Sequence, residues 1–136
     1  MLYQITDQSI HTEELLQKIQ VDTSGAINTF HGIVRRSSRG RNVLYLEYSA
    51  YDTMALKILE QIGQEIYTNM EVDRVIIVHR SGRLHIGETS IFIAVAAPHR
   101  QAAFEGCRYA IEQVKHILPV WKKEVWDGGE EWIHGV

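Results

Sequence analysis

Apolar residues recur at helical spacing in three stretches of the chain. In residues 52–69 they fall at Ala55, Ile58, Ile62 and Ile66, the three-to-four-residue period of an amphipathic helix. Thr12 followed by two acidic residues and a short apolar face predicts a second helix, and Pro119 ends a third. The expected helices cover residues 12–19, 52–69 and 99–118.

Strand patterns lie between these helices and occur in adjacent pairs. The expected strands cover residues 25–34, 43–48, 72–79, 90–97, 120–126 and 132–134. The polar segment 35–42 is predicted to be a loop, and turns are expected near Gly82, near Gly87 and at residues 127–129. Paired strands favour an α+β fold with a mixed or largely antiparallel sheet over strict βαβ alternation. One domain is expected over residues 1–136.

The last predicted helix carries a lysine at the border of its apolar face. We expect that face to consist of Phe104, Cys107, Ile111, Val114 and Leu118. At about 100° per residue, Lys115 falls roughly 20° beyond the Phe104 edge. A lysine partly desolvated beside other cations has a depressed pKa and can act as a base or nucleophile. The alternative is an ordinary solvated helix lysine.

Two more basic or polar side chains stand at the first turn of this helix. The spacing directs His99 and Arg100 toward the protein, where a core would normally exclude them. A helix N-terminus with an added guanidinium favours an anion. The alternative is that both side chains merely begin the helix and extend to water.

Lys122 and Lys123 follow Pro119 in the next predicted strand. Successive strand residues point to opposite faces, so one lysine can face a pocket while the other faces solvent. Trp121 and Trp126 could supply apolar walls.

The basic residues described above form a local cluster, because the chain as a whole carries a slight negative charge. The chain has 136 residues, 45% hydrophobic and 23% charged, with a formal net charge of -3. We therefore expect a globular protein without a general nucleic-acid surface. No signal peptide and no apolar run of about 18 residues is visible, so a cytoplasmic protein without a membrane span is expected. The single Cys107 excludes an internal disulfide, and no metal site or cofactor is expected.

Four arginines occupy the 35–41 segment: Arg35, Arg36, Arg39 and Arg41. They could clamp a phosphate, bind RNA or form a solvated loop. RNA is disfavoured because the loop lacks interleaved aromatic residues. The alternatives to an enzyme are thus a non-catalytic module that binds a phosphorylated ligand or RNA, and a scaffold for dimerisation and docking.

Several motifs together make the chain similar to the large, catalytic subunit of molybdopterin synthase. They are Gly25–Arg35, Leu46–Tyr48 with Tyr51 and Met54, Val78–Leu84 with Gly87 and Glu88, Ala97–Glu105, Lys115 and Pro119–Glu124. The likeness covers roughly residues 25–132, in the same order and spacing.

This resemblance implies an α/β-hammerhead fold and a sulfurtransferase. The family converts cyclic pyranopterin monophosphate into molybdopterin by installing two dithiolene sulfurs. The sulfur donor is a thiocarboxylate on the C-terminal Gly-Gly of a small ubiquitin-like subunit. Two large subunits form a central homodimer, with one small subunit at each end of the heterotetramer.

The resemblance also implies roles for individual residues. Lys115 and Lys122 match the two catalytic lysines, and Lys115 is our first choice for proton transfer. The substrate-binding positions are Ile33, Val34, Arg35, His99, Arg100, Lys123 and Glu124. Relatives often carry a longer basic tail that reaches the neighbouring protomer, a role that His134 or an arginine of the 35–41 segment could take here.

Overall fold

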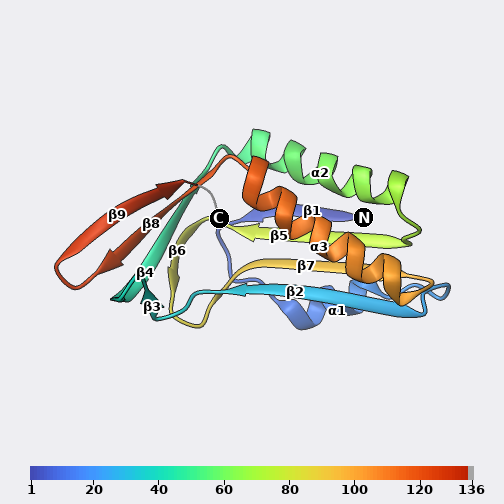
Figure 1. Ribbon diagram of the computed structural model, residues 1–136, viewed down its shortest axis with the longest axis horizontal. Coiled ribbons are helices and arrows are strands. Elements are labelled where there is room, and N and C mark those ends of the chain that lie inside the picture. Colours follow the sequence, from blue (N-terminus) through green and yellow to red (C-terminus); the bar gives the residue numbers. More distant parts are fainter. Residues whose placement is uncertain (135–136) are drawn as a thin grey trace.

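The computed structural model describes residues 1–134 and shows three helices and nine strands in that range (Figure 1). In chain order they are β1 (Leu2–Thr6), α1 (Thr12–Ile19), β2 (Ala26–Ile33), β3 (Ser37–Ser38), β4 (Arg41–Ala50), α2 (Asp52–Asn69), β5 (Arg74–Arg80), β6 (Gly82–His85), β7 (Thr89–Ala97), α3 (Arg100–Ile117), β8 (Val120–Trp126) and β9 (Gly129–His134). The side chain of His134 lies outside the described part, so its expected role has no structural counterpart here.

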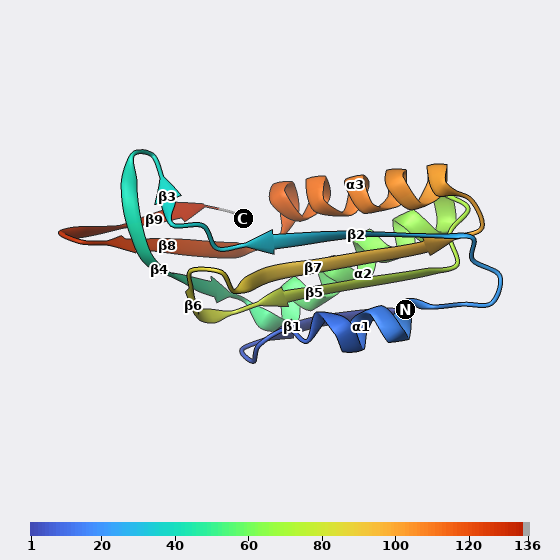
Figure 2. The ribbon, with the colours of Figure 1, turned by 90° about the horizontal axis from the view of Figure 1, so that it is seen from below.

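The first sheet has the strand order β1-β5-β7-β2 and helices on both faces. β1 runs parallel to β5, whereas β7 is antiparallel to β5 and to β2. α2 and α3 pack on one face over the larger core cluster, and α1 packs on the other face (Figure 2). Burial on both faces explains why β5 and β7 read as continuous apolar runs.

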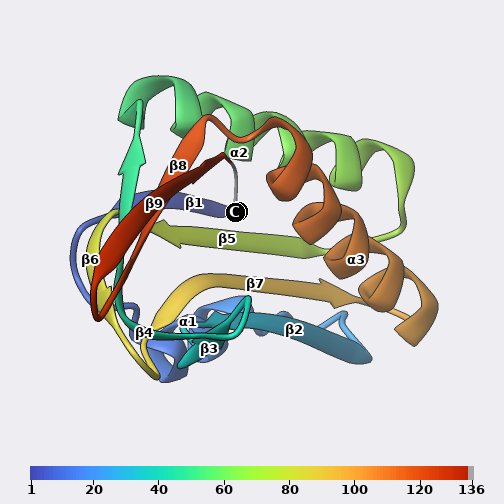
Figure 3. The ribbon, with the colours of Figure 1, turned by 60° about the vertical axis from the view of Figure 1, so that its left-hand side comes forward.

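The second sheet is built around the long strand β4 and projects from one end of the first sheet (Figure 3). β8 pairs along one side of β4, and β9 pairs with β8. β3 and β6 pair with β4 along its other side. Because β8 directly follows α3, this sheet begins where the last helix ends.

The α+β class, the three helices and the mixed sheets are confirmed, but three details were wrong. β1 and β6 were missed, because a five-residue strand and a four-residue strand that begins with a glycine give weak local patterns. Residues 35–42 are not a plain loop, since β3 and the start of β4 form a hairpin there. Phe104 is not in the core, because its side chain is 57% exposed.

Candidate active site

Lys122 is the half-buried centre of a group of cations. Burial lowers the pKa of its amine from the ordinary 10.5, and the positive charges of Lys115, Arg35 and Arg39 lower it further. The carboxylate of Glu124 acts in the opposite direction. These residues come from the end of α3, the hairpin after β2 and strand β8. An amine in such surroundings gives up its proton more easily than a surface lysine.

Lys115 stands in the last turn of α3 with its side chain exposed. The expectation that this lysine is partly desolvated was therefore wrong. Lys122 is the partly buried lysine instead. The helix ends with the Leu118 N–H donating to the Val114 carbonyl, and Pro119 leads directly into β8. This short connection holds the two lysines at neighbouring positions on one continuous segment.

The arginine segment is a tight hairpin fixed to β8. Arg39 has φ 52° and Gly40 has φ 75°, the two positive values of a type I′ turn. The hydroxyl of Ser38 donates to Glu124 Oε2 at 2.9 Å, and Arg41 Nη2 donates to Glu124 Oε1 at 3.4 Å. Glu124, which is 4% exposed, thus anchors the hairpin besides acting on Lys122.

Lys123 points to the opposite face of β8. Its Nζ lies 3.1 Å from Glu47 Oε2 and 3.1 Å from Glu130 Oε2. Hydrogen bonds to Glu47 and then to Glu130 raise the pKa of this amine. The structure therefore does not bring Lys123 together with Lys122, although the resemblance placed both at the site.

Ile33 and Val34 form the end of β2 and the approach to Arg35. Val34 is buried, and its backbone is fixed by N–H donation to the Glu88 carbonyl at 3.0 Å and by acceptance from the Gly87 N–H at 2.8 Å. Ile33 is 51% exposed and lies on a β-bulge. The buried valine holds the start of the hairpin in place, while the isoleucine remains available for contact.

His99 and Arg100 are exposed at the opposite end of α3. Fifteen residues at about 1.5 Å each put Arg100 roughly 22 Å along the helix from Lys115. Near this end, a shallow pocket of about 390 Å³ is lined by Asn69, Met70, Glu71, His99, Gln101, Ala102 and Glu105. One protomer therefore does not bring His99 and Arg100 together with the lysines.

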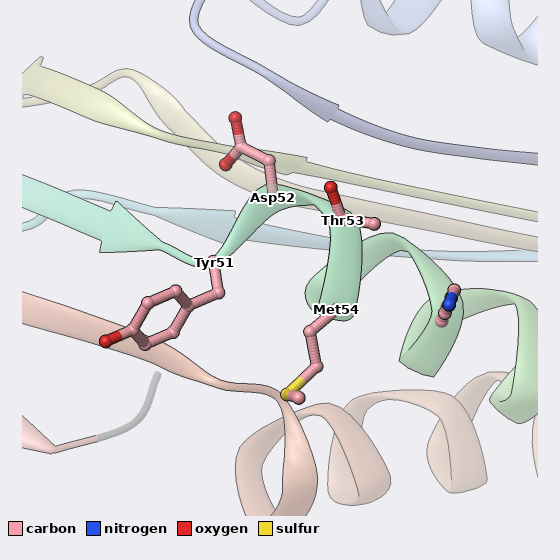
Figure 4. Close-up of a pocket in the computed structure, with 5 residues that line it drawn as sticks. Tyr51, Asp52, Thr53 and Met54 are labelled. Atoms are coloured by element: carbon pink, nitrogen blue, oxygen red, sulfur yellow. The ribbon is translucent and has the colours of Figure 1, made fainter.

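A second pocket of about 390 Å³ lies at the start of α2 and is lined by Tyr51, Asp52, Thr53, Met54 and Lys57. In Figure 4 the side chains of Tyr51 and Met54 point toward the connection from α3 to β8, whereas Asp52 points away. Tyr51 is 73% exposed and Met54 58% exposed. This open apolar surface therefore lies beside the segment that carries both lysines.

From the sequence, Arg39 and Arg41 were predicted only as members of the arginine segment, and Ser38 was missed. The signal that could have found them was the Arg39-Gly40 pair, which suits a two-residue hairpin between polar strands. A hairpin would have predicted cross-strand contacts for residues 38 and 41.

Residues 5–117 match the MoaE protein family. The chain belongs to this family. It is 47% identical over 131 residues to the molybdopterin synthase catalytic subunit of Bacillus subtilis, a match that covers 96% of this chain and 83% of the relative. The family suggested by the sequence motifs is therefore confirmed.

Solved structures agree with the MoaE family assignment. A molybdopterin synthase crystal structure from Staphylococcus aureus superposes with a TM-score of 0.91 at 41% identity, covering 96% of each chain. A complex of subunits 1 and 2 of molybdopterin-converting factor from Helicobacter pylori has a TM-score of 0.81 at 24% identity, covering 96% of this chain and 89% of that one, and shows the shared fold. Within residues 1–134, no helix is long and apolar enough to cross a membrane.

Proposed function

We propose that this MoaE-family enzyme transfers sulfur to cyclic pyranopterin monophosphate and so forms the dithiolene of molybdopterin. The observation that carries the proposal is the half-buried Lys122 among Lys115, Arg35 and Arg39. A cluster of cations suits a phosphorylated substrate and a thiocarboxylate donor, both of which are anionic. The names of the relatives, given above, point to the same reaction.

The two lysines have different surroundings, and this supports different roles. Sulfur addition, ring opening and loss of water need a group that accepts a proton and returns it. The lowered pKa makes Lys122 the better candidate for that exchange. Lys115 and Arg35 would stabilise the negative charge that develops as the thiocarboxylate attacks. The proposed order of the two lysines is thus the reverse of the one expected from the sequence.

His99 and Arg100 keep their proposed role in holding the substrate's phosphate and pterin, but from a second protomer. The length of α3 separates them from Lys122 of the same chain. In the expected homodimer, this pair would complete the site of the neighbouring copy. Arg35 would then bind the substrate from the same chain as the lysines, as would Ile33 and Val34 beside it.

The proposed sulfur donor is the C-terminal Gly-Gly thiocarboxylate of a small ubiquitin-like subunit. The Helicobacter pylori protein of the same fold was solved as a complex of two subunits, in line with such a partner. An extended tail needs open access to the lysines, and the exposure of Lys115 provides it. A heterotetramer with a central homodimer of this chain is the proposed assembly.

The direct experiment combines the protein with a thiocarboxylated small subunit and the cyclic pterin phosphate. We expect a dithiolene product, detected by mass spectrometry, and none when the donor ends in a plain carboxylate. Tight, salt-sensitive binding of the pterin without any product would instead favour the non-catalytic binding module.

The two-protomer site has its own test. Arg100→Ala and Lys122→Ala proteins are each expected to be nearly inactive, but subunit exchange creates mixed dimers with one intact site. Random mixing restores about a quarter of the wild-type rate if the site is shared by two chains. No recovery after verified exchange would place both residues in one chain's site.

A further inference from the structure

Tyr48 stands directly opposite Lys122 in the second sheet. β4 and β8 run antiparallel, and their register pairs Tyr48 with Lys122 and Glu47 with Lys123. Paired residues of this kind share one face of the sheet, with Cβ atoms about 5 Å apart. The contact in the neighbouring pair agrees with this register, because Lys123 Nζ lies 3.1 Å from Glu47 Oε2. The Tyr48 ring therefore lies beside the Lys122 side chain.

Apolar side chains flank Lys122 on both neighbouring strands. Ile133 of β9 pairs with Lys122 on the other side and is half-buried. Tyr48 is only 6% exposed and belongs to the larger core cluster. Burial is the largest cause of the lowered pKa of Lys122, and the charged groups that act on this amine are Glu124, Lys115, Arg35 and Arg39. An aromatic ring next to the amine excludes water from that side and so disfavours its charged form.

The rest of the Tyr48 side chain is fixed by two further contacts. Its ring meets the ring of the fully buried His79 edge to face, with 5.2 Å between the centroids. Its hydroxyl is hydrogen-bonded to the hydroxyl of Ser90. Ser90 Oγ donates its own proton to the Gly32 carbonyl at 3.2 Å, so Tyr48 is the donor to Ser90. The chain of hydrogen bonds thus runs from β4 through β7 to the end of β2.

Gly32 stands at a bulge that leads to Arg35. The register of β2 with β7 shifts between Gly32 and Ile33. A bulge bends its strand and redirects the side chains that follow. A Cβ at Gly32 would lie 3.0 Å from Ser90 Oγ, which shows how closely Ser90 approaches the bulge. The hydrogen bond from Ser90 therefore fixes the point at which the segment carrying Arg35 leaves the sheet.

We propose that Tyr48 is a positioning residue of the sulfur-transfer site, with its ring packed beside Lys122 and its hydroxyl holding, through Ser90, the bulge before Arg35. Lys122 and Arg35 follow from different sheets, and Tyr48 contacts the supports of both. The role is not catalytic, because the hydroxyl is already engaged by Ser90 and the side chain is buried. This inference rests on the proposed function, in which Lys122 and Arg35 act on one substrate.

Removal of the hydroxyl tests the link to Arg35. Tyr48→Phe keeps the ring, so KM for the cyclic pterin phosphate should rise roughly 3–10-fold while kcat stays within about twofold. Ser90→Ala should have the same effect. The double variant should be no worse than the worse single variant, because both changes break one chain of hydrogen bonds.

Tyr45→Phe is the matched control for this test. Tyr45 lies on the same strand, but its ring contacts the Arg83 guanidinium, 4.1 Å from the ring centroid. Its register partner on β8 is Val125, on the face of Lys123. KM should therefore be unchanged in Tyr45→Phe. An equal rise in this control, or fully additive effects of Tyr48→Phe and Ser90→Ala, would overturn the link.

Removal of the ring tests the contact with Lys122. In Tyr48→Val the amine gains access to water, so its pKa should rise by ~0.5 unit or more toward the ordinary 10.5. The pKa is measured by labelling with acetic anhydride across a pH series and mass spectrometry of the Lys122 peptide, with the exposed Lys18 of α1 as internal reference. Tyr48→Phe should keep the wild-type value.

Tyr48→Leu extends the ring test to a variant that retains more of the core volume. It should shift the pKa of Lys122 in the same direction by a smaller amount, and it replaces Tyr48→Val if that protein does not fold. An unchanged pKa in a folded variant without the ring would overturn the ring contact. An unchanged KM in Tyr48→Phe would overturn the role of the hydroxyl.

The two measurements separate this inference from the proposed function. Labelling of Lys122 needs neither the pterin substrate nor the sulfur donor. A shifted pKa in Tyr48→Val without any dithiolene product from wild type would refute the proposed function and leave the ring contact in place. Dithiolene formation with an unchanged pKa and an unchanged KM would refute the positioning role alone.

Discussion

The two faces of β8 place neighbouring lysines in opposite electrostatic surroundings. Burial lowers the pKa of Lys122, and the neighbouring cations lower it further, with the carboxylate of Glu124 opposing them. Lys123 lies between two carboxylates, Glu47 and Glu130, that raise its pKa. The residues are adjacent in sequence and identical in type. Their difference comes from strand alternation, which turns successive side chains to different neighbours.

This contrast supports the proposal that Lys122 is a reactive amine and Lys123 a structural one. An ammonium that is satisfied by two carboxylates has little tendency to give up its proton. An ammonium that is half-buried, with positive charges nearby, gives up its proton more readily. Two adjacent lysines in a sequence do not reveal which of them has the lowered pKa. The charged residues around each lysine, on either face of β8, do reveal it.

The strongest test of the contrast is Lys122→Ala. We expect kcat to fall roughly 10³-fold, because the proton-exchanging amine is lost. Lys122→Arg should not restore the rate, since a guanidinium holds its proton throughout the usable pH range. Rates are to be measured with saturating thiocarboxylated partner, with circular dichroism as a check on folding. A near-normal rate in the folded alanine variant would contradict the assignment.

Lys115→Ala should reduce kcat less, by roughly 10²-fold, because a stabilising charge is removed rather than the proton carrier. Lys115 is exposed, so the free energy of unfolding should remain close to that of wild type. Lys115→Arg, which keeps the positive charge, should recover part of the rate. A deeper loss in Lys115→Ala than in Lys122→Ala would reverse the proposed roles.

The pH dependence of the rate tests the lowered pKa of Lys122. A base must be neutral to accept a proton, so kcat should rise with pH and level off at a pKa below the ordinary 10.5. Because folding lowers this pKa, the amine also makes the fold gain stability as pH rises from the folded-state pKa toward the unfolded value. A profile that still rises through pH 10.5 would show an unperturbed amine.

Glu124→Gln should move that profile to lower pH, since it removes the one carboxylate that raises the pKa of Lys122. We expect a rate loss of roughly tenfold from loosening of the hairpin. Glu131→Gln is the matched control, because Glu131 binds the same Arg41 side chain but is not among the charges acting on Lys122. Equal shifts in both variants would mean that the hairpin, and not the charge, sets the pKa.

The smallest effect is expected for Lys123→Met. This variant keeps the aliphatic stem and removes the ion pairs with Glu47 and Glu130 on the face away from Lys122. Turnover should stay within about twofold of wild type. A loss comparable to that of Lys115→Ala would mean that both faces of β8 take part in the reaction.

The sequence predicted α2 and α3 from their long apolar periods, and α1 from Thr12, the two acidic residues after it and a short apolar face. It missed β1, whose pairing with β5 depends on residues more than seventy positions away. It predicted Lys115, Lys122 and Arg35 as site residues, and their charges do act on one another, yet it assigned the desolvation to the wrong lysine. Helical angle alone could not show that Lys122, on the strand after the helix, is the partly buried lysine. The predicted helix over residues 99–118 did imply that His99 and Arg100 lie a full helix length from Lys115, although the sequence reading grouped them in one site.

The hydrogen bonds of Glu124 to the arginine hairpin affect how tightly the site can bind an anion. Its carboxylate holds Ser38 and Arg41 in the free protein, so the arginine hairpin has its shape before any ligand arrives. Ordering a loose loop on binding would cost about 0.5–1.5 kcal/mol for each immobilised long side chain. A prearranged hairpin avoids much of this entropic loss, and an anion would meet guanidinium groups that are already in position.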